Sequence, residues 1–237
     1  HMKSFAVFDI DGTIIRWQLY HALGDKLAKR GLIEDDAFNK VRDARMGWKK
    51  RNEDSTFKAY ELELINAFDA SLKGMAEQDF LSAADEVFDE YKDQVYKYTR
   101  DMVSKLKSED YLLFAISGSP SYIVNKLADY YGFDDSQATD YEVVDGRLTG
   151  KMNLRFQDKP KCLRELVEKH GATFTNSVGF GDSEGDTEML KIVEAATAFN
   201  PSHQLFEDAK REGWQIVVER KNVIYKLDSR DGSYVLA

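Results

Sequence analysis

Two aspartates separated by one residue follow a short apolar segment near the start of the chain. Residues 4–10 are rich in β-forming side chains, and the segment runs into Asp9-Ile10-Asp11-Gly12-Thr13. In an open α/β sheet, ligands bind beyond the carboxyl ends of the strands, so both carboxylates can face one crevice. Carboxylates placed there can act as a nucleophile, as an acid or base, and as metal ligands. The alternative is an acidic turn without chemistry.

Further polar groups stand where other strands end or a helix starts. A Ser-Gly-Ser triplet (117–119) follows the apolar segment 111–117, Lys159 opens a helical pattern, and Asp182 and Asp186 follow a third strand. Hydrolysis of a phosphomonoester through a covalent intermediate needs a carboxylate nucleophile, an acid for the departing oxygen and positive charge on the phosphoryl oxygens. The combined set contains all of these groups.

Each of these residues also has an interpretation without chemistry. Ser117 can be a turn serine that caps the following helix, and Asp186 can be the N-cap of a helix over 186–193. Lys159 can be a solvated lysine at a helix start. Lys161, two residues further on, is a rival for its role.

The elements that must position these groups alternate between strand and helix. Such alternation implies an α/β fold, here a Rossmann-like parallel sheet with helices on both faces. Short apolar segments predict the strands, and apolar spacing near 3.6 residues predicts the helices. The predicted strands are 4–10, 111–117, 177–182, 195–200 and 214–219, and the predicted helices are 121–132, 159–171 and 186–193.

A long segment after the first strand has a different texture. Between Trp17 and Lys97 the chain has helical periodicity, many charges and no convincing strand, which predicts an all-helical insertion. We therefore expect an α/β core from residues 1–16 and 98–237, and a helical cap from residues 17–97. Residues 139–153 alternate and contain Asp145-Gly146, which predicts a hairpin projecting from the core.

Composition narrows the class of partner. The 237-residue chain has a formal net charge of −9 and 43% hydrophobic residues, as expected for a folded protein that nucleic acid and anionic membranes repel. Its one cysteine, Cys162, can form neither an internal disulfide nor a zinc cluster. We expect a cytoplasmic monomer or homodimer that acts on a small phosphorylated metabolite.

The four motifs, in this order and at these places, resemble the haloacid dehalogenase superfamily. The resemblance spans the whole α/β body, and the helical insertion and the 144–152 hairpin resemble the subgroup that contains the phosphoserine phosphatases. The resemblance implies that Asp9 is the nucleophile that becomes an aspartyl-phosphate. It implies that Asp11 is the acid and base, and that Mg²⁺ is held by Asp9, Asp182 and the backbone carbonyl of Asp11.

The same resemblance implies a cradle for the phosphoryl group. Ser117, the Gly118 N–H and Thr13 would bind its oxygens, and Lys159 would supply positive charge to it and to Asp9. We prefer Lys159 over Lys161 because it matches the family position. Asp186 would support the metal through water or through Lys159.

Three departures from the phosphoserine phosphatase pattern bear on the substrate. Gln18 stands where that subgroup has a glutamate, Leu64 where spacing puts an arginine, and Gly185 where asparagine is frequent. These changes predict a phosphomonoester other than free phosphoserine. A basic patch of the insertion can grip an anionic leaving group or form a solvated helix face: Arg42, Arg45, Lys49, Lys50 and Arg51.

The leading interpretation is a Mg²⁺-dependent phosphatase that works through an aspartyl-phosphate. Within the family, a true phosphoserine phosphatase or a phosphotransferase is the alternative. A dehalogenase is disfavoured because carbon–halogen displacement needs neither the acid Asp11 nor a metal held by Asp182. A binding or regulatory protein that retains the fold is the non-enzymatic alternative, and it would be expected to carry at least one broken motif.

Overall fold

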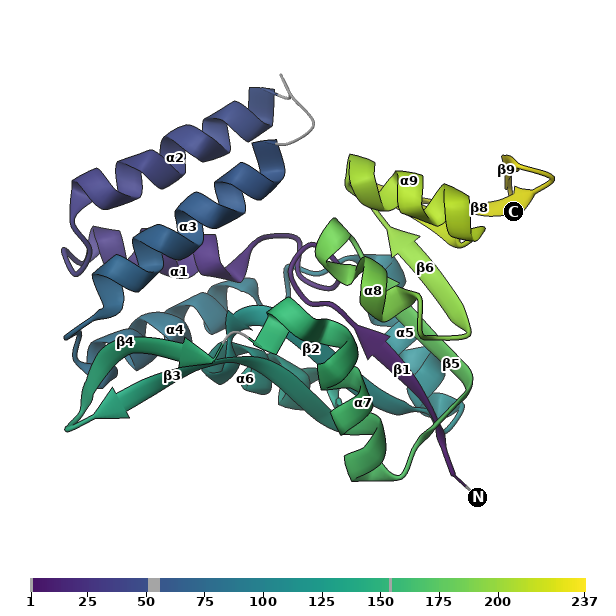
Figure 1. The fold of residues 1–237 in the computed structure, drawn as a ribbon, viewed down its shortest axis with the longest axis horizontal. Helices are drawn as coiled ribbons and strands as arrows, with labels where there is room; N and C mark the ends of the chain where they lie inside the picture. Colours follow the sequence, from purple (N-terminus) through teal and green to yellow (C-terminus); the bar gives the residue numbers. More distant parts are fainter. Residues whose placement is uncertain (1, 51–55, 154) are drawn as a thin grey trace. The chain divides into compact units, whose positions relative to one another are not determined.

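The computed structural model describes residues 2–50, 56–153 and 155–237 and divides the chain into two compact units. The first unit contains residues 1–17, 91–139 and 154–237, and the second contains residues 18–90 and 140–153. Figure 1 shows both units as ribbons. The contact-based boundaries differ from the sequence-based ones chiefly because the 140–153 hairpin associates with the helical segment.

The first unit is built on a twisted sheet whose central strands are parallel. Its order is β3-β2-β1-β5-β6-β7, and the antiparallel strands β8 and β9 extend it at one edge. The bounds are β1 Ser4–Phe8, β2 Leu112–Pro120, β3 Asp135–Val144, β5 Thr173–Gly181, β6 Ala195–Phe199, β7 Gln215–Arg220, β8 Val223–Arg230 and β9 Ser233–Leu236. The α/β class predicted from sequence is confirmed, but the sheet is mixed and not purely parallel.

Helices cover both faces of this sheet, with α7 and α8 on one side and α5 on the other (Figure 1). They are α5 Lys97–Ser108, α6 Ser121–Tyr131, α7 Lys159–His170, α8 Thr187–Leu190 and α9 His203–Glu212. Leu163 of α7 and Leu205 of α9 belong to one buried cluster with the fully buried strand residues Phe5 and Phe114. Burial of this apolar surface is the main force that holds the layers together.

The order of the strands reverses at β1, which makes this strand a topological switch point of the sheet. β1 lies between β2 and β5, so the chain moves from β1 to one side first and to the other side later. Ligands in open α/β sheets bind beyond the carboxyl ends of the strands at such a switch point. β1, β2 and β5 are the strands that precede the aspartate and serine motifs.

The loop that follows β1 is held in place by hydrogen bonds to the start of α5 and to the segment that precedes it. Ile15 bridges Val95, the Arg16 N–H donates to the Gln94 carbonyl at 2.8 Å, and the Thr99 hydroxyl donates to the Thr13 carbonyl at 2.7 Å. These bonds satisfy the backbone of an irregular loop, which therefore holds a defined conformation.

The second unit contains helices and one hairpin. Its helices are α1 Leu19–Lys29, α2 Asp35–Lys50, α3 Thr56–Leu72 and α4 Glu77–Tyr91, whose last residue belongs to the first unit. The carboxyl-terminal half of β3 pairs with β4, Arg147–Asn153, across a turn in which Asp145 and Gly146 have positive φ. The Gly74 N–H donates to the Leu148 carbonyl at 2.7 Å, which joins the hairpin to the end of α3.

Candidate active site

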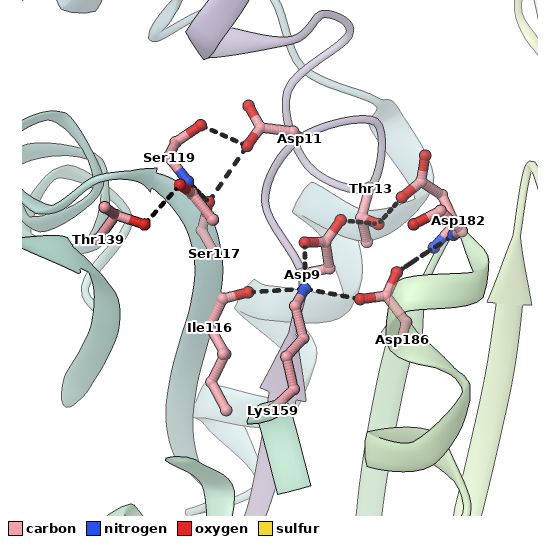
Figure 2. Close-up of polar contacts among 12 residues, drawn as sticks. Asp9, Asp11, Thr13, Ile116, Ser117, Ser119, Thr139, Lys159, Asp182 and Asp186 are labelled. Atoms are coloured by element: carbon pink, nitrogen blue, oxygen red, sulfur yellow. Dashed lines mark hydrogen bonds and ion pairs between the residues drawn. The ribbon is translucent and has the colours of Figure 1, made fainter. Parts of the chain in front are cut away.

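Three carboxylates and one lysine meet at the carboxyl ends of β1 and β5 (Figure 2). Asp9 follows β1 directly, while Asp182 and Asp186 follow β5. The Lys159 Nζ lies 2.8 Å from Asp9 Oδ1 and 2.7 Å from Asp186 Oδ1. The structure thus brings together side chains that are up to 177 residues apart in the sequence, counted from Asp9 to Asp186.

Lys159 is the first residue of α7, and its side chain reaches the Asp9 and Asp186 carboxylates. It is buried, whereas the rival Lys161 is exposed and uses its backbone N–H to bind the Asp158 carboxylate. Burial alone would lower the pKa of Lys159, but the charges of Asp186 and Asp9 raise it above its usual range. Lys159 is therefore a permanent cation between two carboxylates.

Asp186 supports its neighbours through the backbone as well as through Lys159. Its Oδ2 accepts the N–H groups of Asp182 at 3.0 Å and Ser183 at 3.2 Å, and Ser183 and Asp186 form a reciprocal capping box. Asp186 is the N-cap residue of α8, as one sequence interpretation expects, but its side chain makes no capping hydrogen bond to that helix. A Cβ at Gly181 would lie 2.5 Å from the Asp186 Cβ, and only glycine leaves this room.

Gly12 and Thr13 bring the loop that follows β1 close to Asp182, which follows β5. Gly12 has φ +78°, and a Cβ there would overlap the Asp182 carboxylate. The buried Thr13 hydroxyl donates to Asp9 Oδ2 at 3.0 Å, and Asp182 Oδ1 lies 3.4 Å from it. A residue larger than glycine at position 12 would push these carboxylates apart.

The charge balance of the cluster suits a cation. One carboxylate oxygen from each of Asp9, Asp182 and Asp186 lies within 4.8 Å of the others, and within the described residues Lys159 forms ion pairs with both Asp9 and Asp186. Burial, and then the charges of Asp9 and Asp186, raise the pKa of Asp182 well above its usual range. Carboxylate oxygens are the ligands that Mg²⁺ prefers, so these residues fit a divalent cation.

The Asp11 side chain lies against β2 and outside the three-carboxylate cluster. Its Oδ2 accepts hydrogen bonds from the Ser117 hydroxyl at 3.1 Å and from the Ser119 hydroxyl at 2.6 Å (Figure 2). Ser117 therefore does not cap α6, whose N-cap is Pro120. The Thr139 hydroxyl donates to the Gly118 carbonyl at 2.8 Å, which holds the carbonyl side of the residue whose N–H the sequence assigns to phosphate binding.

Sequence reasoning missed the contributions of Ser119 and Thr139. The signal for Ser119 was present, because it belongs to the same Ser-Gly-Ser triplet at the end of a strand as Ser117. Thr139 carries no comparable signal. It meets Gly118 only because β2 and β3 pair in parallel.

The remaining predicted residues belong to the helical unit, and their roles stay predictions. Gln18 is the N-cap residue of α1 and makes no side-chain capping bond. On α2, an Arg45 Nη1 lies 2.5 Å from His21 Nε2, and an Arg42 Nη2 lies 3.9 Å from Asp25 Oδ1. Lys49 and Lys50 are exposed, while Arg51 and the side chain of Leu64 lie outside the described residues.

A substitution at Asp182 tests the electrostatics of the cluster. The folded protein raises the pKa of Asp182 above its ordinary value of 3.8, so the folded state favours the protonated carboxyl group. The free energy of unfolding is therefore highest below pH 3.8 with respect to this group, and it falls as the pH rises through the raised pKa. At pH 7 without metal, Asp182→Asn should therefore raise Tm by about 2–4 °C, the shift that ~1 kcal/mol produces in a chain of this size. Mg²⁺ should raise Tm of the unmodified protein and leave the variant unchanged.

Thermal unfolding in EDTA and in Mg²⁺ provides this measurement. Asp145→Asn, in the exposed hairpin turn, is the control for loss of one carboxylate. A lower Tm for Asp182→Asn than for the control in EDTA, together with an undiminished Mg²⁺ response, would contradict the account.

Comparison with known proteins defines the class. The family model described as "haloacid dehalogenase-like hydrolase" matches residues 6–191, and the chain belongs to this family. Its fold is similar to that of a structure titled "Phospho-Aspartyl Intermediate Analogue of Phosphoserine phosphatase", with TM-score 0.66, 20% identity, and coverage of 94% of this chain and 96% of the other. At that identity the likeness establishes the fold.

Relatives with curated names carry more than one activity. A phosphoserine phosphatase of Archaeoglobus fulgidus is 26% identical over 206 residues, covering 86% of this chain and 54% of the relative. A histidinol-phosphatase of Neisseria meningitidis serogroup C is 25% identical over 231 residues, covering 91% of this chain and 99% of the relative. The chain thus spans about half the length of the archaeal relative. No helix in the described ranges combines the length and apolar character needed to cross a membrane.

Proposed function

We propose that the protein is a Mg²⁺-dependent phosphatase that hydrolyses a small phosphomonoester through an aspartyl-phosphate on Asp9. The observation that carries the proposal is the Lys159 ammonium between Asp9 and Asp186, beside a third carboxylate, Asp182. Asp9 is buried with 6% of its surface exposed, and Lys159 limits the repulsion between it and an incoming phosphate. Membership of a hydrolase family supports the same reaction class.

The first half-reaction transfers the phosphoryl group to the protein. An Asp9 carboxylate oxygen attacks phosphorus, the bond from phosphorus to the substrate's ester oxygen breaks, and protonated Asp11 gives its proton to that departing oxygen. The Ser117 hydroxyl, the Gly118 N–H and Thr13 would bind phosphoryl oxygens. Lys159 supplies fixed positive charge where negative charge develops.

The second half-reaction returns Asp9 to its free state. Asp11, now ionised, removes a proton from water as the water oxygen attacks phosphorus, and the bond between Asp9 and phosphorus breaks to release inorganic phosphate. Asp9, Asp182 and the backbone carbonyl of Asp11 would hold Mg²⁺, with Asp186 behind them. When bound, Mg²⁺ supplies charge that offsets repulsion between the nucleophile and the phosphate.

The helical segment would act as a cap that selects the leaving group. In the division predicted from the sequence, residues 17–97 form this cap, and residues 1–16 and 98–237 form the core. A cap excludes water before phosphoryl transfer. Transfer to another alcohol, and a non-catalytic binding role, are the alternatives. Release of inorganic phosphate in stoichiometric amounts with the free alcohol distinguishes hydrolysis from both. A cytoplasmic location and a monomeric or homodimeric state remain part of the proposal.

The substrate would be a phosphomonoester other than free phosphoserine. A neutral Gln18 cannot give an ammonium group the charge-assisted hydrogen bond that a glutamate offers. A polar group left unpaired in a partly desolvated site costs binding free energy. The named relatives include a phosphoserine phosphatase and a histidinol-phosphatase, so both phosphate esters belong in the test.

A metabolite panel measures this preference. Phosphoserine should show a kcat/KM at least about tenfold below the best member of a panel that includes histidinol phosphate, because a site built to pair polar groups discriminates strongly. Gln18→Glu should reduce the difference in kcat/KM between phosphoserine and the best substrate. Gln78→Glu, which makes the same charge change at an exposed position of α4, should leave that difference unchanged. If phosphoserine ranks first by tenfold or more, the assignment of Gln18 is wrong.

A further inference from the structure

Asp11 is held by two hydroxyl groups that come from one strand. Ser119 Oγ lies 2.6 Å and Ser117 Oγ 3.1 Å from the same oxygen, Asp11 Oδ2. Both serine side chains are fully buried, while Asp11 is partly buried. In Figure 2 the Asp11 carboxylate lies beside the two serine side chains, and these contacts stay within the first unit.

Local sequence explains the orientation of Ser119. Ser117 and Ser119 lie in β2 where its register with β3 shifts between Ile116 and Pro120, and both hydroxyls reach the same carboxylate oxygen. The residue before a proline is restricted to extended backbone, and Pro120 thus keeps Ser119 in the strand conformation. The Ser119 N–H also donates to Ser117 Oγ at 3.0 Å, which ties the two serines together.

The proton count separates the roles of the two serines. A serine hydroxyl has one proton to donate. In the proposed reaction Ser117 gives its proton to a phosphoryl oxygen, so its bond to Asp11 must be released when substrate binds. Ser119 is then the serine of β2 that still holds the Asp11 carboxyl group.

We infer that Ser119 is a positioning residue, which orients Asp11 for proton transfer to the departing oxygen. This inference rests on the proposed phosphatase function. Without the Ser119 hydroxyl, the Asp11 carboxyl group loses the 2.6 Å hydrogen bond that remains once Ser117 has turned to the phosphate. A misplacement of 1 Å in a reacting group can cost about 10²-fold in rate.

The dependence on the leaving group separates positioning from general damage. An alkoxide is a poor leaving group and needs the proton of Asp11, whereas 4-nitrophenolate departs with little help. The parameter kcat/KM covers the steps up to phosphoenzyme formation, in which the leaving group departs. Loss of Asp11 orientation must therefore lower kcat/KM for an alkyl phosphate more than for 4-nitrophenyl phosphate, while loss of folded protein lowers both equally.

The experiment compares Ser119→Ala, Ser119→Cys and Ser119→Thr on these two substrates. For the alanine variant we expect kcat/KM to fall by about 10²-fold on the alkyl phosphate, within the range of general acid catalysis, and by less than about threefold on 4-nitrophenyl phosphate. The cysteine side chain has a size similar to that of serine, but its S–H group is a weak hydrogen-bond donor. The Ser119→Cys variant should therefore lose activity as the alanine variant does. Threonine keeps the hydroxyl and should restore most of the alkyl activity.

Ser177→Ala is the matched control, because Ser177 is also a fully buried strand serine but accepts the Glu194 N–H and does not contact the site. It should leave the ratio of the two kcat/KM values unchanged. Equal losses on both substrates, or no loss, in the alanine and cysteine variants would overturn the inference. Asp11→Asn distinguishes this from failure of the proposed function: if it loses alkyl activity selectively and the Ser119 variants do not, only the role of Ser119 is wrong.

Discussion

Asp9→Asn should lower kcat for 4-nitrophenyl phosphate by about 10⁴-fold or more, because an amide oxygen is a poor nucleophile and removal of a covalent nucleophile costs losses of this order. The structure allows this substitution without steric change, since asparagine has the shape of aspartate. Asparagine also retains an oxygen that can accept the Lys159 hydrogen bond. Steady-state release of 4-nitrophenol with excess Mg²⁺ measures the effect.

The control for Asp9→Asn is Asp145→Asn, which removes a carboxylate in the exposed hairpin turn and should keep full activity. Thermal unfolding establishes that both variants fold. A folded Asp9→Asn protein that retains more than about a tenth of the activity would exclude covalent catalysis by Asp9.

Lys159→Ala should lower kcat by about 10²–10³-fold, the scale observed when one preorganised electrostatic donor is deleted from an active site. Two carboxylates, Asp9 and Asp186, lose their common cation in this variant. The approach of an anionic substrate to Asp9 then becomes more repulsive. The transition state, in which charge builds on the phosphoryl oxygens, also loses a partner.

Lys161→Ala is the matched comparison, since it removes the same charge two residues away at an exposed position. It should change kcat by less than about twofold, because exposed charges are screened by solvent. The opposite ranking of the two alanine variants would transfer the role to Lys161. Both variants need their kcat measured at saturating Mg²⁺, so that altered metal affinity does not enter the comparison.

The convergence of Asp9, Lys159 and Asp182 could be predicted from the sequence because strand ends are visible in it. An apolar segment that runs into acid and glycine marks the carboxyl end of a buried strand, and parallel strands bring such ends to one edge. The spacing of these residues along the chain carries no distance information. Their meeting follows from the strand order, with β1 between β2 and β5.

The hydrogen bonds of Asp11 and Asp186 could not be predicted in the same way. Whether Asp186 caps a helix or binds Lys159 depends on side-chain rotamers and on the close approach that Gly181 permits. Ser119 belongs to the same Ser-Gly-Ser triplet as Ser117. The sequence pattern does not reveal, however, that both hydroxyls reach one oxygen of the Asp11 carboxylate.

The carboxyl-terminal hairpin was absent from the predicted fold although its signal is clear in retrospect. Asp231 and Gly232 both have positive φ and connect β8 to β9, which is the turn chemistry that favours tight hairpins. The residues of the two flanking strands are all exposed or partly buried. The same Asp-Gly signal predicts the hairpin turn at 145–146.

Covalent labelling of Asp9 is the decisive measurement for the proposed reaction. The protein is mixed with a substrate carrying a radioactive phosphoryl group, quenched in acid within the first turnover, digested and analysed by mass spectrometry. The account predicts one phosphoryl group on the peptide that contains Asp9, absent from Asp9→Asn and lost on further incubation before the quench. Turnover without any label on the protein, or a label on another residue, would contradict it.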